Sequence, residues 1–396
     1  MLIKEKYHFA FAHLANLLYR NPSRELTVVG VTGTKGKSTT VELLAAVFDA
    51  AGKKTAFISS VRMKIGGAVE INRTGNSMPG RGQLQRFLRK AADQGCRYAF
   101  VEVTSQGIIQ HRARFIEWDG GVFTNLAPEH IESHGSFEAY REAKLGFFRM
   151  LAASPKRQKI AVANKDDAAS FLFLEAARSG GVREISVSAK TLGAELQLEK
   201  GWISAPVNLE NAALATAYAE AKNIPRHIIR EALNAFPGIP GRLEYIVREP
   251  FAAMVDYAHT PDSLTRAYEF LKSEHSGRLI CVLGAAGGGR DKWKRPEMGR
   301  VAATFCDEII LTNEDPYDES PEGIVREIME GIPKAERGKA RIVLDRREAL
   351  KEALSGARAG DAVVATGKGS ETTIHMAGEE VIPWNEKNEI KSILKL

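Results

Sequence analysis

The sequence predicts an α/β protein with two domains, each built on a mainly parallel β-sheet. Strand-like apolar runs alternate with helix-like runs along almost the whole chain, which is the pattern of strands joined by crossover helices. The stretch "NAFPGIPGRLEY" at 234–245 interrupts this alternation with two prolines and two glycines, and the alternation restarts after it. A length of 396 residues also fits two or three domains.

Apolar periodicity places most elements of the first domain. We expect strands at 27–31, 55–59, 97–103, 121–124, 158–163 and 183–187. We expect helices at 38–51, 82–93, 137–152, 167–178, 209–222 and 225–235. A short amphipathic helix or linker is expected over 1–24, so the central domain would span 25–238. In the C-terminal domain, 239–396, strands are expected near 252–256, 278–283, 308–312, 341–344 and 361–366.

The composition argues against several classes of protein. With 44% hydrophobic and 26% charged residues, the chain has enough apolar side chains for a globular core. No run of 18 apolar residues predicts a membrane span, and the N-terminus lacks the long apolar segment of a signal peptide. The net charge of +6 is spread along the chain, so it does not indicate a nucleic-acid partner and fits an anionic small substrate.

The three cysteines, Cys96, Cys281 and Cys306, are scattered along the sequence. Their spacing argues against a disulfide framework and against a zinc site. Cys281 lies in the apolar run "RLICVLG", so we expect it to be a buried core thiol. This cysteine usage favours a reducing, cytoplasmic location.

The most informative stretch is "GVTGTKGKSTT" at 30–40, which joins an apolar run to a helical one. The N–H groups and dipole of a helix N-terminus form an anion site. Lys37 would reach the β- and γ-phosphates of a nucleotide, and the Ser38 hydroxyl would bind Mg²⁺. The strict GxxxxGK[ST] spacing is not met, because five residues separate Gly30 from Gly36. The strand–turn–helix order still predicts nucleotide binding by Gly33, Thr34, Lys35, Gly36, Lys37, Ser38 and Thr39.

Two further stretches supply residues suited to a metal. Glu102 lies among apolar residues near the end of the strand in "YAFVEVTS", and a lone buried carboxylate is costly unless it is paired or metal-bound. His130 and His134 follow another strand in "FTNLAPEHIESHG". Each histidine taken alone is more often structural than a ligand.

The predicted helix "FEAYREAKLGFFRML" carries Lys144 on the same face as its apolar residues. One interpretation is a lysine whose stem lies along the core while its head reaches water. The other is a desolvated lysine with a lowered pKa, partly neutral and able to react. The sequence leaves both open.

With these residues assembled, the chain resembles the Mur ligase family, whose members are ATP-dependent enzymes that add amino acids to peptidoglycan precursors. Within the family it is most similar to the MurE type, the UDP-N-acetylmuramoyl-tripeptide synthetases. The resemblance runs from about Asn21 to Trp384. It rests on "GVTGTKGKSTT", "EVTSQGIIQHR", "FTNLAPEHIESHG", "YREAK", "NLEN", "PGR", "DYAHTPDSL", "GRDKWKRPEMG", "EDPY" and "GKGSE". The implied fold is a central P-loop-type parallel-sheet ATPase domain followed by a Rossmann-like α/β C-terminal domain.

The resemblance implies roles for particular residues. Lys37 matches the phosphate grip; Ser38, Glu102 and His130 resemble Mg²⁺ ligands; and Lys144 matches a carbamylated lysine whose added carboxylate supports a second metal. Implied nucleotide contacts are Asn211, Arg242, Asp256 and His259. Residues implied to hold the muramoyl-peptide acceptor are Ser77, Thr104, Gln110 and Arg112. Residues implied at the pocket for the incoming amino acid are Arg290, Asp315, Tyr317, Gly367 and Glu371.

The implied reaction has two steps. The acceptor carboxylate attacks the γ-phosphate of ATP to give an acyl phosphate and ADP, and the amine of the amino acid then displaces phosphate through a tetrahedral intermediate. Positioning and charge neutralisation by Lys37 and Mg²⁺ would carry catalysis, with no side-chain nucleophile. The implied catalytic elements lie on both domains, so closure between them is expected.

The chain departs from the family pattern before its first strand. MurE-type enzymes carry a whole uridine-diphosphate-binding domain there, whereas only about 25 residues precede the strand here, too few to bury a core. We therefore expect the acceptor to be held by the central domain alone or with a partner chain, or not to be UDP-linked.

A second departure lies at 314–317, which reads Glu-Asp-Pro-Tyr. Family members that use meso-diaminopimelate have Asp-Asn-Pro-Arg, whose arginine pairs with the distal carboxylate. With that arginine absent and acidic groups present, a cationic side chain such as that of lysine or ornithine fits better. The alternative is that these acids simply pair with Arg290, Lys292 or Lys294.

Three other functions stay open. A folylpolyglutamate synthase-like ligase shares the phosphate turn and the two-domain layout, but its Asp-Gly-Ala-His-Asn-Pro type of motif reads "DYAHTP" here. A ligase for a non-peptidoglycan polymer, such as the ligase half of cyanophycin synthetase, is harder to separate. A non-catalytic nucleotide-binding partner is disfavoured by the intact set Lys37, Glu102, His130 and Lys144.

Overall fold

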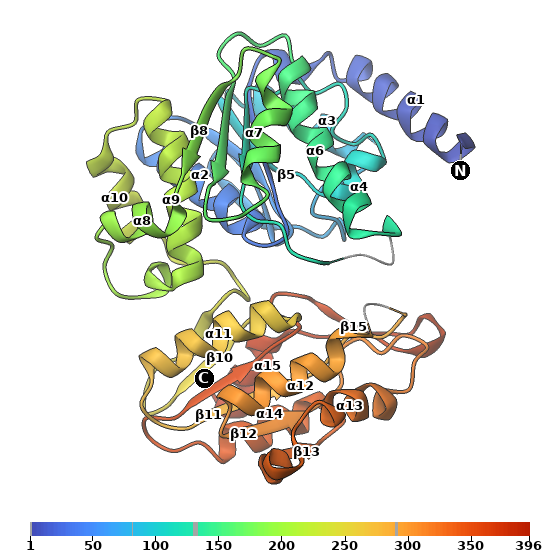
Figure 1. Cartoon of the computed structure of the whole chain (residues 1–396), viewed down its shortest axis with the longest axis vertical. Coiled ribbons are helices and arrows are strands. Elements are labelled where there is room, and N and C mark those ends of the chain that lie inside the picture. Colours follow the sequence, from blue (N-terminus) through green and yellow to red (C-terminus); the bar gives the residue numbers. More distant parts are fainter. Residues whose placement is uncertain (1, 81, 130–133, 290–291) are drawn as a thin grey trace. The chain divides into compact units, whose positions relative to one another are not determined.

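The computed structural model describes residues 2–80, 82–129, 134–289 and 292–396. It divides into two compact units, Met1–Pro237 and Gly238–Leu396 (Figure 1). The boundary falls in the proline- and glycine-rich stretch. Each unit has helices packed on a mainly parallel sheet, which confirms the predicted fold class.

Unit 1 is built on an eight-stranded sheet in the order β4-β3-β2-β5-β1-β6-β7-β8. Its strands are β1 (Thr27–Thr32), β2 (Thr55–Ile58), β3 (Arg62–Ile65), β4 (Ala68–Ile71), β5 (Tyr98–Glu102), β6 (Gly120–Phe123), β7 (Ile160–Asn164) and β8 (Arg183–Val187). The run from β2 to β8 is parallel, while β3 and β4 form an antiparallel hairpin at one edge. Since β1 pairs with both β5 and β6, the carboxyl ends of these three strands lie together.

Helices cover both faces of this sheet. They are α1 (Leu2–Leu18), α2 (Lys37–Ala50), α3 (Gln83–Asp93), α4 (Ser105–Ile109), α6 (Phe137–Ala153), α7 (Ser170–Arg178), α8 (Ala189–Glu195), α9 (Pro206–Ala221) and α10 (Arg226–Asn234), with short 3₁₀ turns at Pro22–Arg24 and Trp202–Ser204. Side chains of α3, α6 and α7 form one hydrophobic cluster, and those of α2, α9 and α10 form another. Successive residues of β1 alternate between them, with Val28 in the first and Val29 in the second, because neighbouring strand residues point to opposite faces.

Unit 2 is built on a six-stranded sheet in the order β13-β12-β11-β14-β10-β9. Its strands are β9 (Glu244–Val247), β10 (Ala252–Val255), β11 (Leu279–Leu283), β12 (Glu308–Leu311), β13 (Ala340–Ile342) and β14 (Ala362–Ala365), with a separate hairpin of β15 (Thr373–His375) and β16 (Val381–Pro383). The helices are α11 (Pro261–Glu274), α12 (Lys294–Phe305), α13 (Pro321–Glu330), α14 (Arg346–Ser355) and α15 (Glu386–Leu394), with 3₁₀ turns at Lys334–Lys339 and Ala377–Glu379. Within the sheet, β9 pairs antiparallel and the other pairings are parallel.

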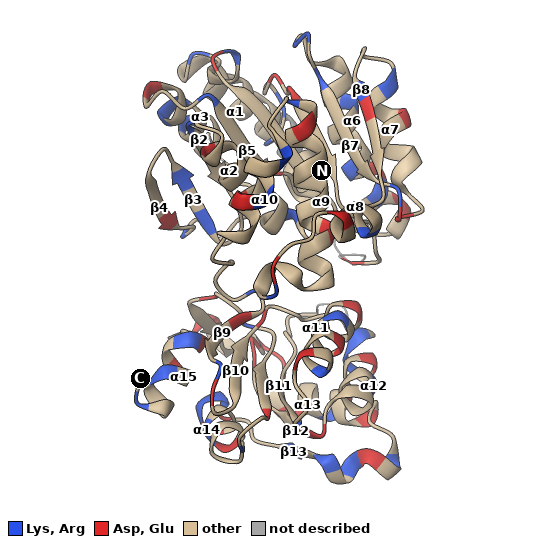
Figure 2. Cartoon of the chain, turned by 90° about the vertical axis from the view of Figure 1, so that its left-hand side faces the viewer, with Lys and Arg blue, Asp and Glu red and all other residues tan. Residues whose placement is uncertain are grey.

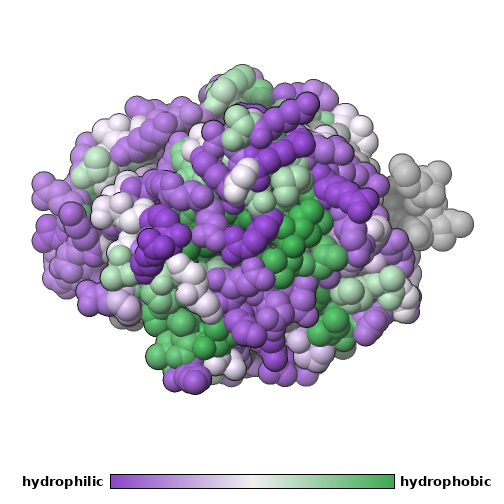
Figure 3. Space-filling model, turned by 90° about the horizontal axis from the view of Figure 1, so that it is seen from below, coloured by the Kyte–Doolittle hydropathy of each residue, from purple (hydrophilic) through white to green (hydrophobic). Residues whose placement is uncertain are grey.

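The surface matches the composition. Lys and Arg residues and Asp and Glu residues are interspersed along the helices and loops of both units (Figure 2). Hydrophilic side chains cover much of the face seen in Figure 3, with hydrophobic ones in separate groups. Within the described ranges, no helix is long and apolar enough to cross a membrane.

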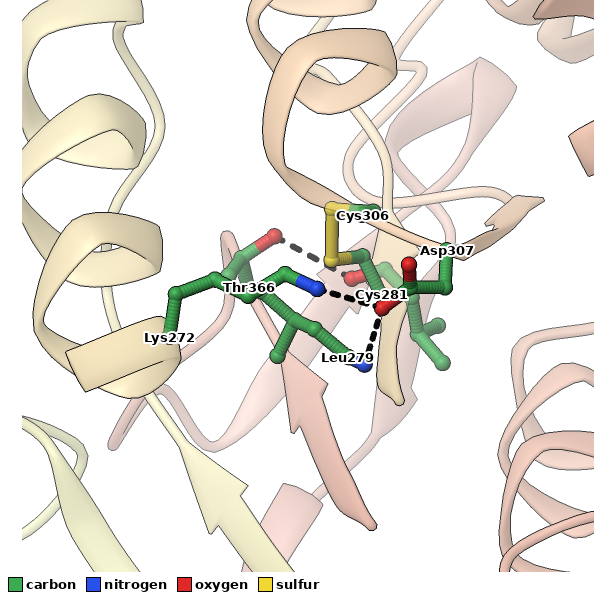
Figure 4. The surroundings of a disulfide bond; sticks show 7 residues. Lys272, Leu279, Cys281, Cys306, Asp307 and Thr366 are labelled. Carbon is green, nitrogen blue, oxygen red and sulfur yellow. Dashed lines mark hydrogen bonds and ion pairs between the residues drawn. A yellow bond between two sulfur atoms is a disulfide. The ribbon is translucent and has the colours of Figure 1, made fainter. Parts of the chain in front are cut away.

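The prediction that the cysteines form no disulfide is wrong for Cys281 and Cys306. Cys281 in β11 and Cys306 directly after α12 form a disulfide with Cα atoms 6.1 Å apart (Figure 4), whereas Cys96 is free and buried. Their separation of 25 residues concealed the pairing. The crossover through α12 brings the chain back beside β11, because β12, which begins at Glu308, is the parallel neighbour of β11. The cysteine pattern therefore gives no support to a reducing location.

A buried ion pair joins α14 to α15 in unit 2. Arg346 Nη2 lies 2.7 Å from Glu386 Oε1, and the two side chains are 1% and 0% exposed. The next pair along the same helices, Arg347 with Glu389, also lies at 2.7 Å, but the Arg347 side chain is 62% exposed. These neighbours allow a matched test of what burial does to an ion pair.

We expect Arg346→Met to lower the free energy of unfolding by about 3–5 kcal/mol, because it leaves a buried carboxylate without its partner. We expect Arg347→Met to lower it by less than about 1 kcal/mol, since an exposed pair is screened by water. Urea denaturation followed by circular dichroism measures both. Equal losses in the two variants would contradict the assignment.

Candidate active site

The turn between β1 and α2 provides the N-terminus of an uncapped helix. Gly36 precedes α2 with φ of 81°, and no side chain among the described residues caps this helix. Helices α6, α11 and α14 are capped by Ser136, Thr260 and Asp345, whereas α3, α7, α9, α10 and α12 lack a side-chain cap as α2 does. An uncapped N-terminus leaves N–H groups and the positive end of the dipole for an anion, as the sequence predicts.

Neighbouring strands and helices hold this turn at distances that only glycine allows. A Cβ atom on Gly33 would lie 1.9 Å from Thr124 Oγ1, and one on Gly36 would lie 2.2 Å from Asn211 Oδ1. The Asn211 amide of α9 accepts a hydrogen bond from Thr40 Oγ1 at 3.2 Å. Predicted as a nucleotide contact, Asn211 thus lies directly against the turn.

Two lysine amines converge on one carbonyl of the turn. Lys37 Nζ donates to Gly33 O at 3.1 Å and to Thr34 O at 2.8 Å. Lys144 Nζ, from α6, donates to the same Gly33 O at 2.6 Å. A third lysine of the turn, Lys35, forms an ion pair with Glu129 at 2.7 Å.

The structure decides between the two interpretations of Lys144. The residue is 1% exposed, and its amine lies 4.6 Å from the centre of the Tyr140 ring, so it does not reach water. Burial, with a smaller contribution from the charge of Lys37, holds the pKa of Lys144 well below its ordinary value, against the opposing effects of Glu129 and Glu102. Burial therefore favours the neutral form of the Lys144 amine.

An oxygen-rich group lies beside the turn. Glu102, at the end of β5, is 3% exposed, and its Oε2 accepts hydrogen bonds from Ser38 Oγ at 2.7 Å and from Ser60 N at 2.9 Å. The two serine hydroxyls are 2.8 Å apart. Hard oxygen donors of this type suit Mg²⁺. Ser60 was not predicted from the sequence, where its only signal is a position just after β2, the sheet neighbour of β5.

The predicted ligand His130 lies outside the described residues. Among the described ones, no group of three or more histidine, cysteine, aspartate and glutamate residues could hold a metal. His134, also considered in the sequence, is described: its Nε2 lies 3.1 Å from Ser105 Oγ, next to the N-cap of α4. Thr39 is buried in the first turn of α2.

The four predicted acceptor residues lie around α4. Thr104 caps that helix by accepting from Gly107 N at 3.0 Å. Arg112 donates to Met78 O at 2.6 Å and to Gln110 Oε1, and burial lowers the pKa of its guanidinium. Arg112 therefore ties the segment after α4 to the loop that carries Ser77.

The predicted nucleotide contacts of unit 2 cluster at the end of β10. Asp256 is buried, and its carboxylate accepts from Leu243 N and Ala258 N, both at 2.7 Å. Burial raises the pKa of Asp256 despite these bonds and the nearby charge of Arg242. The Arg242 guanidinium lies 4.0 Å from the centre of the Tyr257 ring. His259 Nδ1 lies 2.7 Å from the backbone oxygen of Tyr257.

A second cluster in unit 2 contains the predicted amino-acid residues. Lys368 is fully buried and bridges Asp315 at 2.8 Å and Glu371 at 2.7 Å. Asp315 thus has a partner that the sequence did not indicate, while Lys292 pairs with Glu319. Lys368 lies in the motif "GKGSE", but only Gly367 and Glu371 of that motif were predicted to be site residues.

Glu314 and Gly367 belong to the same cluster. A Cβ atom on Gly367 would lie 2.5 Å from Glu314 Oε2, an oxygen that is buried with no hydrogen-bond partner among the described residues. Burial raises the pKa of the Glu314 carboxyl, although Lys368 opposes this. Tyr317 stacks on His375 with ring centres 5.3 Å apart. Arg290 lies outside the described residues.

Fold and turn together define an α/β protein with a P-loop-like anion site. Comparison with known proteins gives the family. Residues 31–218 match the Mur ligase middle domain, and residues 241–369 match the Mur ligase, glutamate ligase domain. The chain belongs to the Mur ligase family, and it is an ATP-dependent, ADP-forming amide ligase.

Several relatives are similar over nearly the whole chain. A UDP-N-acetylmuramyl-tripeptide synthetase of Roseiflexus sp. (strain RS-1) is 35% identical over 97% of this chain and 82% of its own length. A UDP-N-acetylmuramoyl-L-alanyl-D-glutamate–2,6-diaminopimelate ligase of Syntrophomonas wolfei is 34% identical over 98% of this chain and 82% of its own.

Two solved structures extend the comparison. One, of a UDP-N-acetylmuramoyl-L-alanyl-D-glutamate–2,6-diaminopimelate ligase, is 29% identical, with a TM-score of 0.61 and coverage of 93% of this chain and 78% of the other. The other, the folylpolyglutamate synthase of Mycobacterium tuberculosis complexed with ADP and AMPPCP, has a TM-score of 0.70 at 17% identity and covers 90% of this chain and 92% of the other. At that identity, the second likeness concerns the fold alone.

The lowered pKa of Lys144 predicts a pH-dependent stability. Between the lowered pKa of the folded state and the pKa of about 10.4 for an unfolded lysine, the unfolded chain binds more protons, so stability rises with pH. In CO₂-free buffer, Lys144→Met should therefore be more stable than the unchanged chain at pH 7, with the difference shrinking toward pH 10. Thermal unfolding at several pH values measures this.

The exposed Lys165 provides the control, because Lys165→Met should leave the pH dependence unchanged. A Lys144→Met variant less stable than the unchanged chain at pH 7 would show that the buried amine is held as a stabilised cation.

Proposed function

We propose that the chain is a MurE-type ligase that joins an amino acid to a carboxylate acceptor, UDP-N-acetylmuramoyl-L-alanyl-D-glutamate or a related peptidoglycan precursor. The observation that carries the proposal is the convergence of Lys37 and Lys144 on Gly33 O beside the hydrogen-bonded pair of Ser38 and Glu102. The names of the relatives support the acceptor. A cytoplasmic location belongs to the same proposal.

The first step needs negative charge to be neutralised at the turn. The N–H groups at the start of α2 would bind phosphate oxygens of ATP, and Lys37 would turn from the loop carbonyls toward the γ-phosphate. Ser38 and Glu102 would hold Mg²⁺, which supplies positive charge to the phosphates. The acceptor carboxylate then forms a bond to the γ-phosphorus as the bond to ADP breaks, which gives the acyl phosphate.

Lys144 would contribute as a carbamate. Only a neutral amine adds CO₂, and burial favours that form here. The carbamate would add an anionic carboxylate to Lys144, whose amine lies beside Gly33, and would offset the charge of Lys37. Incubation with ¹³C-bicarbonate followed by NMR would detect the carbamate carbon, and Lys144→Arg provides the control.

The second step needs the amino acid beside the acyl phosphate. The cluster in unit 2 places Glu314, Asp315 and Glu371 near Lys368, and the charges of Arg346 and Lys294 also act on Glu314. The stretch 314–317 offers no arginine to a distal carboxylate, whereas a second ammonium group would meet the acidic side chains of this cluster. We therefore propose L-lysine, or a similar cationic amino acid, as the substrate.

Phosphate release from ATP tests the ligase. With Mg²⁺, UDP-N-acetylmuramoyl-L-alanyl-D-glutamate and L-lysine, we expect release together with a tripeptide product by mass spectrometry. Lys37→Ala should lower the rate at least about 100-fold because it removes the cation at the γ-phosphate, while Lys165→Ala should not change it. Release that does not require the acceptor would contradict the proposal.

If ATP binds but no product forms, the same assay is repeated with a folate and with a polymer primer. Product with either one would replace the peptidoglycan acceptor. Activity that appears only with added cell extract would favour a partner chain that recognises the acceptor.

The choice of amino acid is tested at Tyr317. In the unchanged chain, kcat/KM should be higher for L-lysine than for meso-diaminopimelate, and Tyr317→Arg should shift the ratio at least about tenfold toward meso-diaminopimelate by adding a cation for its distal carboxylate. Tyr317→Phe is the matched control. Higher turnover of meso-diaminopimelate than of lysine by the unchanged chain would refute the assignment.

A further inference from the structure

Two segments of unit 2 lie against each other at the proposed amino-acid pocket. The glycine segment, 284–289, follows β11, and the acidic segment, 312–320, follows β12 and contains Asp315 and Tyr317. Because β11 and β12 are parallel neighbours, both segments leave the sheet at the same edge. The positions of Asp315 and Tyr317 therefore depend on how the two segments are held together.

The backbones of the two segments are in direct contact. Gly287 N donates to Asp315 O at 2.8 Å, and a Cβ atom on Gly287 would lie 2.0 Å from Pro316 O. A Cβ atom on Gly288 would lie 3.2 Å from the ring of Tyr317. Since there is no slack between these backbones, a displacement of the glycine segment would displace the acidic segment as well.

One carboxylate joins the two segments. Glu319, near the end of the acidic segment, accepts a hydrogen bond from Gly289 N at 2.7 Å through Oε1. Its other oxygen, Oε2, lies 3.0 Å from Arg295 Nη1 and 3.1 Å from Lys292 Nζ. Burial raises the pKa of the Glu319 carboxyl, but its bonds with these three partners outweigh burial and lower the pKa to about 2. Glu319 is therefore a carboxylate at neutral pH.

Arg295 holds this carboxylate from the inside of unit 2. Its side chain, on α12, is fully buried, and its Nη2 donates to Ala286 O in the glycine segment at 3.1 Å. Its Nη1 donates to Glu319 and also, at 2.8 Å, to Glu327 Oε2. Glu327 belongs to α13, which lies outside both segments and packs beside α12 (Figure 1). One guanidinium thus has two carboxylate partners, of which only Glu319 belongs to the pocket segments.

We propose that Glu319 is a positioning residue for the amino-acid pocket, where with Arg295 it fixes the glycine segment against Asp315 and Tyr317. This rests on the proposed function, because it takes the cluster around Asp315 as the site for the incoming amino acid. Glu319 acts through its neighbours and not by binding the substrate. Loss of its charge should therefore weaken the use of the amino acid and leave the use of ATP unchanged.

Steady-state kinetics of the whole chain tests the proposal, with Mg²⁺, ATP, UDP-N-acetylmuramoyl-L-alanyl-D-glutamate and L-lysine. Glu319→Gln should raise KM for L-lysine at least about tenfold, because small displacements in a pocket are costly, and should change KM for ATP less than about twofold. Glu327→Gln is the matched control, since it removes the other carboxylate from the same Arg295 nitrogen. It should change KM for L-lysine less than about twofold.

A similar rise in KM for L-lysine and for ATP, or equal effects of Glu319→Gln and Glu327→Gln, would overturn the proposal in favour of a general loss of stability. An unchanged KM for L-lysine in Glu319→Gln would overturn it as well. Circular dichroism at the assay temperature establishes that both variants are folded. If the unchanged chain uses another amino acid, KM for that amino acid replaces KM for L-lysine.

Hydrogen–deuterium exchange separates this proposal from the ligase reaction, because it needs no substrate. In Glu319→Gln, peptides that cover 284–289 should exchange at least about fivefold faster than in the unchanged chain, whereas Glu327→Gln should leave their exchange unchanged. Turnover that requires no amino acid would refute the ligase function, and the exchange measurement would then decide the role of Glu319. Equal exchange in the two variants would overturn that role.

Discussion

The carbonyl oxygen of Gly33 is the point on which the arrangement of unit 1 depends. It accepts from Lys37 at 3.1 Å and from Lys144 at 2.6 Å. Two ammonium groups around one neutral acceptor repel each other, and the repulsion grows where water is excluded. Burial of Lys144 relieves this by favouring its neutral form. The apolar face of α6 therefore favours the neutral form of Lys144 as well as contributing to the core.

The same turn restricts its neighbours sterically. Thr124 at the end of β6 and Asn211 on α9 approach so closely that a Cβ atom at Gly33 or Gly36 would overlap them. Strands β5 and β6 flank β1, so Glu102 and Thr124 reach the turn from opposite sides. A parallel sheet gathers such residues at its carboxyl edge. The geometry around the turn therefore depends on the order of the strands as well as on its glycines.

In unit 2, buried acidic side chains are paired with buried cations. Its acids are neutralised inside the protein, Glu386 by Arg346 and Asp315 by Lys368. In the first pair, both side chains are buried and Arg346 also donates to Thr366 O, so the charges are neutralised within the protein. The second leaves Glu314 with an unpaired buried oxygen.

The sequence by itself determined the local order of strand, turn and helix, because apolar periodicity and glycine placement act over a few residues. It predicted the α/β class, the turn at 33–39 and the apolar face of α6. It also contained the β3–β4 hairpin, whose Gly66-Gly67 turn and alternating residues were a readable signal that was missed.

Only the tertiary structure decided what depends on strand order and burial. It paired Cys281 with Cys306, brought Ser60 to Glu102 and gave Asp315 its partner Lys368. It also removed Lys144 from water, where the sequence allowed two interpretations. These contacts join residues distant in the chain, and their energies come from desolvation and close packing, which no short stretch of sequence encodes.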